Sequence, residues 1–193
     1  MALFHRRESP PPELLALLDR DERVVGWGTG GQAHVLATPR GLWWPSDAGY
    51  RRIGWERVDK ATWRDGVLTV TEADVVDDLL LVDRDAVSIE LAVPRHLPAA
   101  VRTRVDTNVV HTELMPVPGG SARVVARRVP GQDGLVWWAR LEAGVNDSDE
   151  VRAAVRRQIE RIQARSVAVP VVAVRPVAGD GGLQAGGDRT PGA

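Results

Sequence analysis

Apolar residues in the first half of this chain come in short runs that Gly, Pro and Asp interrupt every several residues. Such runs predict short β-strands joined by turns. The alternation of apolar and polar residues is clearest in Val67–Thr71 and Val87–Leu91. The predicted strands are Arg23–Gly28, Ala33–Thr38, Leu42–Trp44, Tyr50–Gly54, Val58–Trp63, Val67–Glu72, Leu79–Val82 and Val87–Ala92. The pattern is typical of an antiparallel meander.

The period of the apolar residues changes from two to about four between Pro94 and His111. Apolar residues at four-residue steps predict an amphipathic helix, and Pro98 suits its first turn. The stripe consists of Leu97, Val101, Val105 and Val109. A shorter helix is predicted over Glu13–Asp19, after a loose leader at residues 1–9.

A smaller unit follows the helix. Met115–Gly120 is expected to be a linker, and Pro130–Gly134 is a strong turn signal between strands at Ala122–Val129 and Leu135–Ala143. Asn146–Arg165 is predicted to be a helix, with Asp147 and Glu150 in a capping-box-like start. Its apolar face consists of Val151, Val155, Ile159 and Ile162. A lone hairpin and helix is marginally stable, so this unit should dock on the meander.

The end of the chain has little periodicity. Val167–Val174 is a candidate edge strand, and the Gly-rich segment from Pro176 onward is expected to be disordered. The predicted organisation is a leader with a short helix (1–21), a β domain with a capping helix (22–112), a docked hairpin–helix unit (113–175) and a tail (176–193).

Strands closed by one amphipathic helix resemble the pleckstrin-homology (PH) superfold. Ile53–Trp63, followed by Gly66–Val70, is similar to the central strands of bacterial PH-like domains, in which an aromatic-then-aliphatic turn precedes a Gly-led hairpin. The resemblance covers residues 22–112. It implies an α+β, mostly β fold, with an antiparallel partial barrel capped by a helix, and a binding role rather than catalysis.

Composition narrows the function classes. The net charge of -1 disfavours a general polyanion binder, and the absence of cysteine excludes thiol catalysis, zinc–thiolate sites and disulfides. The N-terminus lacks the apolar region of a secretory signal, and no window has the run of roughly 20 apolar residues that a membrane span needs. A cytoplasmic location is therefore expected.

Gly26–Gly31 contains the spacing G-x-G-x-x-G, which binds a dinucleotide when a helix follows it. The β-leaning residues after it favour a hairpin turn instead. A nucleotide or anion site there remains the alternative hypothesis, and a helix beginning near Gln32 would support it.

The acidic residues and the histidines are more simply explained as structural or surface residues than as metal or catalytic sites. The acids around residues 72–85 have no calcium-loop spacing and are expected to form a solvated loop. His5, His34, His96 and His111 lack metal-ligand spacing. Neither a hydrolase motif nor a phosphate-binding loop occurs, so we predict no catalytic residue, metal or cofactor. Few cations are clustered in the sequence, so binding of a lipid headgroup is not expected either.

Two adjacent tryptophan pairs are the most unusual feature of the sequence. On a strand, neighbouring side chains face opposite ways, so one Trp of each pair should point away from the local core. Trp beside Arg is frequent at protein contacts and can also stack on single-stranded nucleic acid. The candidate surface consists of Trp43, Trp44, Trp137, Trp138, Arg123, Arg127 and Arg140, with Arg128 nearby. The expected function is a protein-binding or self-associating scaffold, with nucleic-acid binding as a minor alternative.

Overall fold

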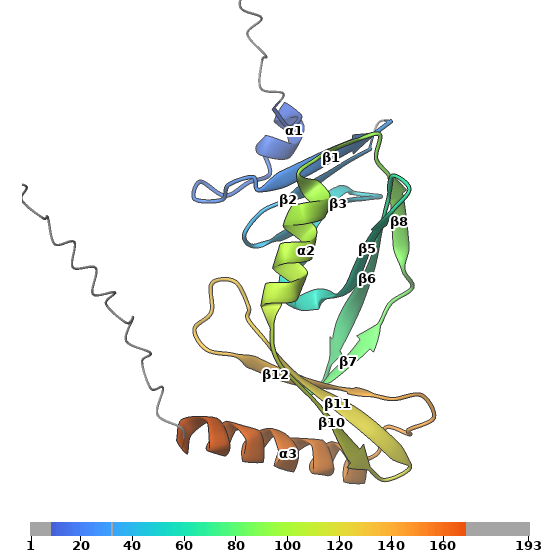
Figure 1. The fold of residues 1–193 in the computed structure, drawn as a ribbon, viewed down its shortest axis with the longest axis vertical. Coiled ribbons are helices and arrows are strands. Elements are labelled where there is room, and N and C mark those ends of the chain that lie inside the picture. The colour runs from blue at the N-terminus through green and yellow to red at the C-terminus, as the bar shows by residue number, and fades with distance from the viewer. Residues whose placement is uncertain (1–8, 32, 169–193) are drawn as a thin grey trace, which may run out of the picture.

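The computed structural model describes residues 9–31 and 33–168 (Figure 1). Strands make up 47% of the structure and helices 23%, so the fold is α+β and mostly β, as predicted. Two predicted segments, the leader before residue 9 and the tail at 176–193, lie outside the described residues. The candidate edge strand at 167–174 does too, apart from its first two residues, which belong to a helix.

The first sheet contains five strands in the order β4-β3-β2-β1-β9, and all its pairs are antiparallel. Its strands are β1 (Gly26–Gly30), β2 (Ala33–Ala37), β3 (Gly41–Ser46), β4 (Gly49–Gly54) and β9 (Val93–Arg95). The predicted meander accounts for the consecutive strands β1 to β4. β9 joins the sheet from further along the chain.

The second sheet has the order β10-β11-β12-β7-β6-β5, with β8 also paired to β6. Its strands are β5 (Val58–Arg64), β6 (Val67–Val76), β7 (Leu80–Asp83), β8 (Val87–Glu90), β10 (Val109–Val117), β11 (Gly120–Arg127) and β12 (Val136–Leu141). The first half of β6 pairs with β5 and β8, and its second half pairs with β7. β7 in turn pairs with β12 in parallel, so β6 and β7 connect the meander to the C-terminal hairpin.

The helical elements are α1 (Pro12–Leu15), the 3-10 turn η1 (Trp55–Arg57), α2 (Leu97–Asn108) and α3 (Asp149–Ala168). α2 packs against β1, β2 and β5 and closes the curled sheets (Figure 1). Leu97 and Val101 of α2 enter a core with Val35, Trp55 and Leu68.

α3 lies across the hairpin strands at the other end of the molecule (Figure 1). Its predicted apolar face is confirmed, because Val151, Val155, Ile159 and Ile162 are all buried in a second core. A small third cluster, Ala73, Leu81, Val125 and Trp138, combines residues of β6 and β7 with residues of β11 and β12.

Four local predictions were wrong. The short helix predicted over Glu13–Asp19 is α1, which begins at Pro12 and already ends at Leu15. α2 ends at Asn108 instead of reaching His111, because the chain enters β10 there and Asn108 donates from Nδ2 to the Arg128 carbonyl at 2.6 Å. The predicted linker at Met115–Gly120 is instead the end of β10 and its turn into β11. The Ser148 hydroxyl, rather than Asp147, accepts a hydrogen bond at the start of α3, from the Val151 N–H at 3.3 Å.

Candidate functional site

The first tryptophan pair divides as strand alternation predicts. Trp44 is buried in the first core, whereas Trp43 is half-buried on the opposite face of β3. The Arg52 guanidinium carbon lies 5.7 Å from the centroid of the Trp43 ring, a cation–π contact. Trp43 is therefore partly covered by its own chain.

The second pair divides in the same way. Trp138 is buried in the small third cluster, and Trp137 is half-buried against the core under α3. The Trp137 and His111 ring centroids are 5.5 Å apart. Among the described residues, neither pair places a fully exposed indole on the surface.

The three predicted arginines differ in their exposure. Arg123 is exposed and its Nη2 lies 3.2 Å from Glu142 Oε1. Arg140 is mostly covered, with Nη2 2.9 Å from Asp59 Oδ1 and a second ion pair to Asp83. Arg127 is only 3% exposed. With Trp44, Trp138 and Arg127 buried, the predicted residues do not form one continuous surface.

Arg127 extends from β11 to the start of β5. Its Nη1 donates to the carbonyls of Val58 at 2.6 Å and Glu56 at 3.3 Å, and its Nη2 lies 3.3 Å from Asp59 Oδ1. Burial lowers the pKa of the Arg127 guanidinium, and the Asp59 carboxylate opposes that change. Arg127 therefore links the hairpin to the meander by charge-assisted hydrogen bonds.

The predicted solvated acidic loop is wrong for Glu72 and Asp74, which lie in β6, whereas Asp77, Asp78, Asp83 and Asp85 are exposed. Glu72 is buried and pairs with Arg51 at 2.7 Å and with Arg84 at 3.4 Å. Asp74 pairs with Arg57 at 2.6 Å, and its hydrogen bond from Arg84 lowers the pKa of its carboxyl. The other pairs are Asp77–Arg152 and Asp83–Arg140. Most of the acids are thus used in internal ion pairs between strands and helices.

Gly26–Gly31 is the strand β1 and its turn, and a strand rather than a helix follows it. The glycines permit close approach of other backbone segments. A Cβ on Gly26 would lie 2.9 Å from the His96 carbonyl oxygen, and one on Gly30 would overlap the Glu90 carbonyl oxygen. The helix N-terminus that a dinucleotide loop needs is not there, so these glycines serve strand packing.

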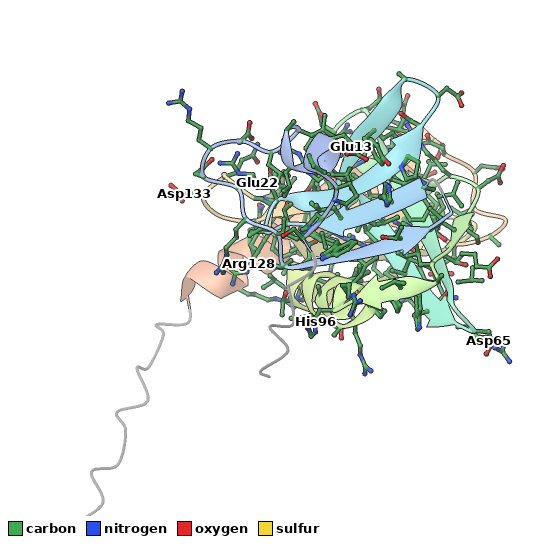
Figure 2. The ribbon with its side chains drawn as sticks, turned by 90° about the horizontal axis from the view of Figure 1, so that it is seen from above. Glu13, Glu22, Asp65, His96, Arg128 and Asp133 are labelled. Atoms are coloured by element: carbon green, nitrogen blue, oxygen red, sulfur yellow. The ribbon has the colours of Figure 1, made fainter. Side chains whose placement is uncertain are left out.

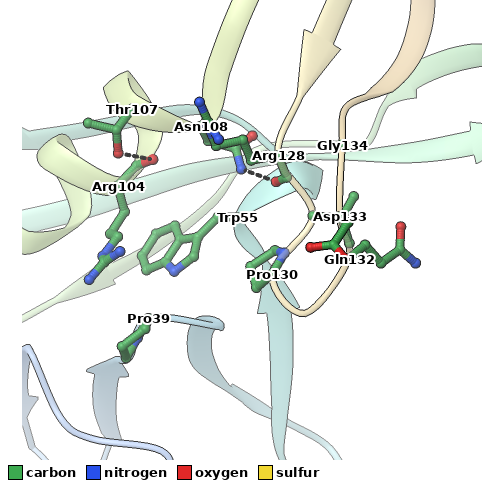
Figure 3. A pocket seen from close by; sticks show the side chains of 11 residues that line it. Pro39, Trp55, Arg104, Thr107, Asn108, Arg128, Pro130, Gln132, Asp133 and Gly134 are labelled. Carbon is green, nitrogen blue, oxygen red and sulfur yellow. Dashed lines mark hydrogen bonds between the residues drawn. The ribbon is translucent and has the colours of Figure 1, made fainter.

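A pocket of about 350 Å³ lies where the two units meet (Figure 3). Its walls come from the end of α2, from Trp55 and from the loop between β11 and β12. The Trp55 Nε1 donates to the Thr38 carbonyl at 2.9 Å, so the indole N–H is already used within the chain. The lining residues are Pro39, Trp55, Arg104, Thr107, Asn108, Arg128, Val129, Pro130, Gln132, Asp133 and Gly134.

Glu56 follows Trp55, which lines this pocket. Burial raises the pKa of the Glu56 carboxyl, although Arg57 and Arg127 act in the opposite direction. The folded state therefore holds this proton more tightly than the unfolded chain. The resulting stabilisation is present below the ordinary glutamate pKa and is lost as the pH rises through the folded-state value. Asp74, with a lowered pKa, has the opposite pH dependence.

Glu56→Gln is thus expected to raise the urea midpoint at neutral pH and to change it little below the ordinary glutamate pKa. Paired urea titrations at the two pH values measure the effect. The exposed Glu142→Gln serves as the matched control. A lower midpoint for Glu56→Gln at neutral pH would show that the neighbouring arginines outweigh the cost of burial.

A larger groove, of about 560 Å³, runs between β5 and α2. Apolar side chains form most of its lining, and Arg102 and Asp106, 3.6 Å apart, lie on its helical rim. The lining residues are Ala61, Thr62, Trp63, Leu68, Pro98, Ala99, Val101, Arg102 and Asp106. No tryptophan of the predicted pairs contributes to it.

β5 forms one end of the second sheet, so its outer edge faces this groove. Asp65 and Gly66, both with positive φ, form the two-residue turn to β6 and project from the molecule (Figure 2). Because Arg64 and Val67 flank that turn, alternate pairing directs the backbone groups of Ala61 and Trp63 away from β6. The groove therefore combines apolar side chains with strand backbone that pairs with no other strand in the described part of the chain.

Two features of the sequence already indicated the walls of this groove. They are the Asp65-Gly66 dipeptide, which is typical of a hairpin turn, and the amphipathic helix that begins near Pro98. The sequence did not show that β5 would be an edge strand, because edge position depends on the order of strands in the sheet.

Within residues 9–31 and 33–168, the structure contains no cluster of three potential metal-ligating side chains. None of the helices in that part of the chain is long and apolar enough to cross a membrane. Neither a protein-family model, nor a curated protein, nor a solved structure matches this chain.

Proposed function

We propose that this chain is a non-catalytic, PH-like interaction module that binds an extended segment of a partner protein in the groove between α2 and β5. The observation that carries the proposal is the outer edge of β5 beside an apolar groove of about 560 Å³. An extended peptide adds to such an edge through main-chain hydrogen bonds, and side-chain pockets select its sequence.

The PH-like assignment is supported by the order of elements. A four-stranded meander is followed by the strands β5 to β9 and then by α2, which covers the open side of the curled sheets. The hairpin and α3 add a second core that Arg127 and Arg140 join to Asp59. This arrangement leaves the groove on α2 and β5 uncovered by the described residues.

The groove also indicates the chemistry of its partner. Trp63, Leu68 and Val101 provide an apolar floor for one or two aliphatic or aromatic side chains. The helical rim carries one cation and one anion, Arg102 and Asp106, so it favours neither an acidic nor a basic segment strongly. The expected partner is an extended segment with apolar residues at alternate positions, since alternate residues of a strand face the same side.

Ala99→Arg is expected to abolish binding, because Ala99 is exposed, lines the groove and would place a long cation across it. Thr103→Arg is the matched control, since Thr103 is exposed on α2 but does not line the groove. Peptides selected from a random displayed library on the immobilised protein provide the ligands. Fluorescence anisotropy with these peptides measures the dissociation constants of both variants.

Hydrogen exchange identifies where the selected peptides bind. The proposal predicts new protection of the Ala61 and Trp63 amides on peptide addition. A library that selects no peptide, or peptides that protect another part of the chain and bind Ala99→Arg as well as the wild type, would contradict it.

A further inference from the structure

β10 is the other end strand of the second sheet, and among the described residues it pairs only with β11. The pairing runs from Val117 opposite Gly120 to Val109 opposite Arg127, with a bulge between Val109 and His111. One whole side of this strand therefore has no strand next to it in the described structure.

The turn to β11 determines which backbone groups lie on that open side. Pro118 and Gly119 form a two-residue turn, so Val117 and Gly120 form a hydrogen-bonded pair. Pairs alternate along an antiparallel ladder, so Met115 and Glu113 also bond to β11. The N–H and C=O groups of Leu114 and Thr112 consequently point to the open edge.

The side chains on the face away from α3 are uncharged. Val110 is 45% exposed and Leu114 is 53% exposed, and Thr112 lies between them. Edge strands of soluble proteins are usually protected by charged side chains, prolines or bulges. In β10 the proline and the bulge lie toward its ends, at Pro116 and at Val109–His111. The charged side chain between them, Glu113, is half-buried on the face toward α3, where it accepts a hydrogen bond from Gln158. Residues 110–114 therefore form a short pairing window.

This window is complementary to itself. When two copies run antiparallel with Thr112 opposite Thr112, Val110 faces Leu114 of the second copy, and His111 faces Glu113 of the second copy. The first juxtaposition pairs two apolar side chains and the second pairs an imidazole with a carboxylate. Cross-strand pairs of both kinds stabilise antiparallel sheets.

We propose that β10 is a homodimerisation edge, pairing antiparallel with β10 of a second copy about a two-fold axis at Thr112. Thr112 then forms a hydrogen-bonded pair with its own equivalent, as the outward direction of its backbone groups requires. The interface is isologous and closes with two copies, so it produces a dimer rather than a filament. This surface is separate from the groove between α2 and β5.

The experiment uses the full chain and an exchange of charges across the proposed register. Val110→Glu and Leu114→Lys are each expected to weaken the dimer at least about tenfold, because each places two unpaired charges opposite apolar side chains. Together in one chain they are expected to restore it, since each introduced carboxylate then faces an introduced ammonium group of the second copy. Sedimentation equilibrium measures the dimer dissociation constants. Val82→Lys, at a 54% exposed valine on β7, is the control.

Each result bears on the register. A wild-type chain that stays monomeric up to millimolar concentration, or a dimer that both single variants retain, would overturn the proposal. Loss of the dimer in the single variants without recovery in the double variant would exclude this register. Protection of the Thr112 and Leu114 amides that does not depend on protein concentration, and that disappears when residues 169–193 are deleted, would show that the chain's own end covers β10.

Discussion

Replacing Arg127 by alanine is expected to lower the free energy of unfolding by about 3 kcal/mol. The guanidinium is almost fully buried and donates to the Val58 and Glu56 carbonyls and to Asp59. The substitution leaves these carbonyls without their charged donor and removes one of the two cations that pair with Asp59. Urea unfolding followed by circular dichroism measures the loss.

Arg123→Ala is the matched control for this prediction. Arg123 lies on the same strand, but its ion pair with Glu142 is exposed, so its removal should cost less than about 1 kcal/mol. Arg127→Lys should fall between the two, since lysine keeps the charge but not the planar fork of donors. Equal losses for Arg123→Ala and Arg127→Ala would show that the buried hydrogen bonds contribute little.

The shape of the unfolding curve gives further information about Arg127. The hairpin and α3 form a second core together with Leu79 and Leu80, and Arg127 and Arg140 add ion pairs to β5 and β7. Weakening that connection is expected to separate the unfolding of the two units, so that Arg127→Ala shows two transitions where the wild type shows one. A single, uniformly shifted transition would mean that the shared strands β6 and β7 suffice for cooperativity.

Trp55→Ala is expected to destabilise the chain by about 3–5 kcal/mol, as large-to-small substitutions of buried aromatic residues do. The Trp55 side chain is 2% exposed, belongs to the first core and donates from Nε1 to the Thr38 carbonyl at 2.9 Å. The substitution leaves a cavity under α2 and removes the donor to Thr38. The urea midpoint and the unfolding slope together provide the measurement.

Two further variants separate the causes. Trp55→Phe keeps most of the ring volume and removes the hydrogen bond, so it should lose about 1 kcal/mol from the missing donor, together with a smaller packing term. Trp43→Ala should lose less than Trp55→Ala, since Trp43 is half-buried on the outer face of β3. A greater loss at Trp43 than at Trp55 would contradict this description of the core.

The alternation and spacing of apolar residues predicted most of the regular structure. Strands such as Val67–Glu72 were found because each carries a period of two between turn residues, and α3 was found because its stripe has a helical period. Both patterns are local, since they express which face of one element is buried. The boundary of α2 was missed, because residues Val109–Met115 suit either a helix or a strand until β11 pairs with them.

The ionic interactions could not be predicted in this way. Glu72, Asp74 and Asp83 appear in the sequence as a run of acids, and only the folded chain places Arg51, Arg57, Arg84 and Arg140 beside them. In the sequence, Arg127 likewise resembles the exposed Arg123 of the same strand. Its burial depends on the distant carbonyls of Val58 and Glu56, which lie 69 and 71 residues away along the chain, closing over it.

The sequence by itself therefore determined the strand-rich class, the helical stripes and the inward and outward alternation of each tryptophan pair. The tertiary structure alone decided that Trp44, Trp138 and Arg127 are buried, that β5 borders a groove, and that β10 is an end strand of the second sheet. The physical reason is that side-chain periodicity records burial along one element. Edge position and charge pairing depend on which distant strands become neighbours.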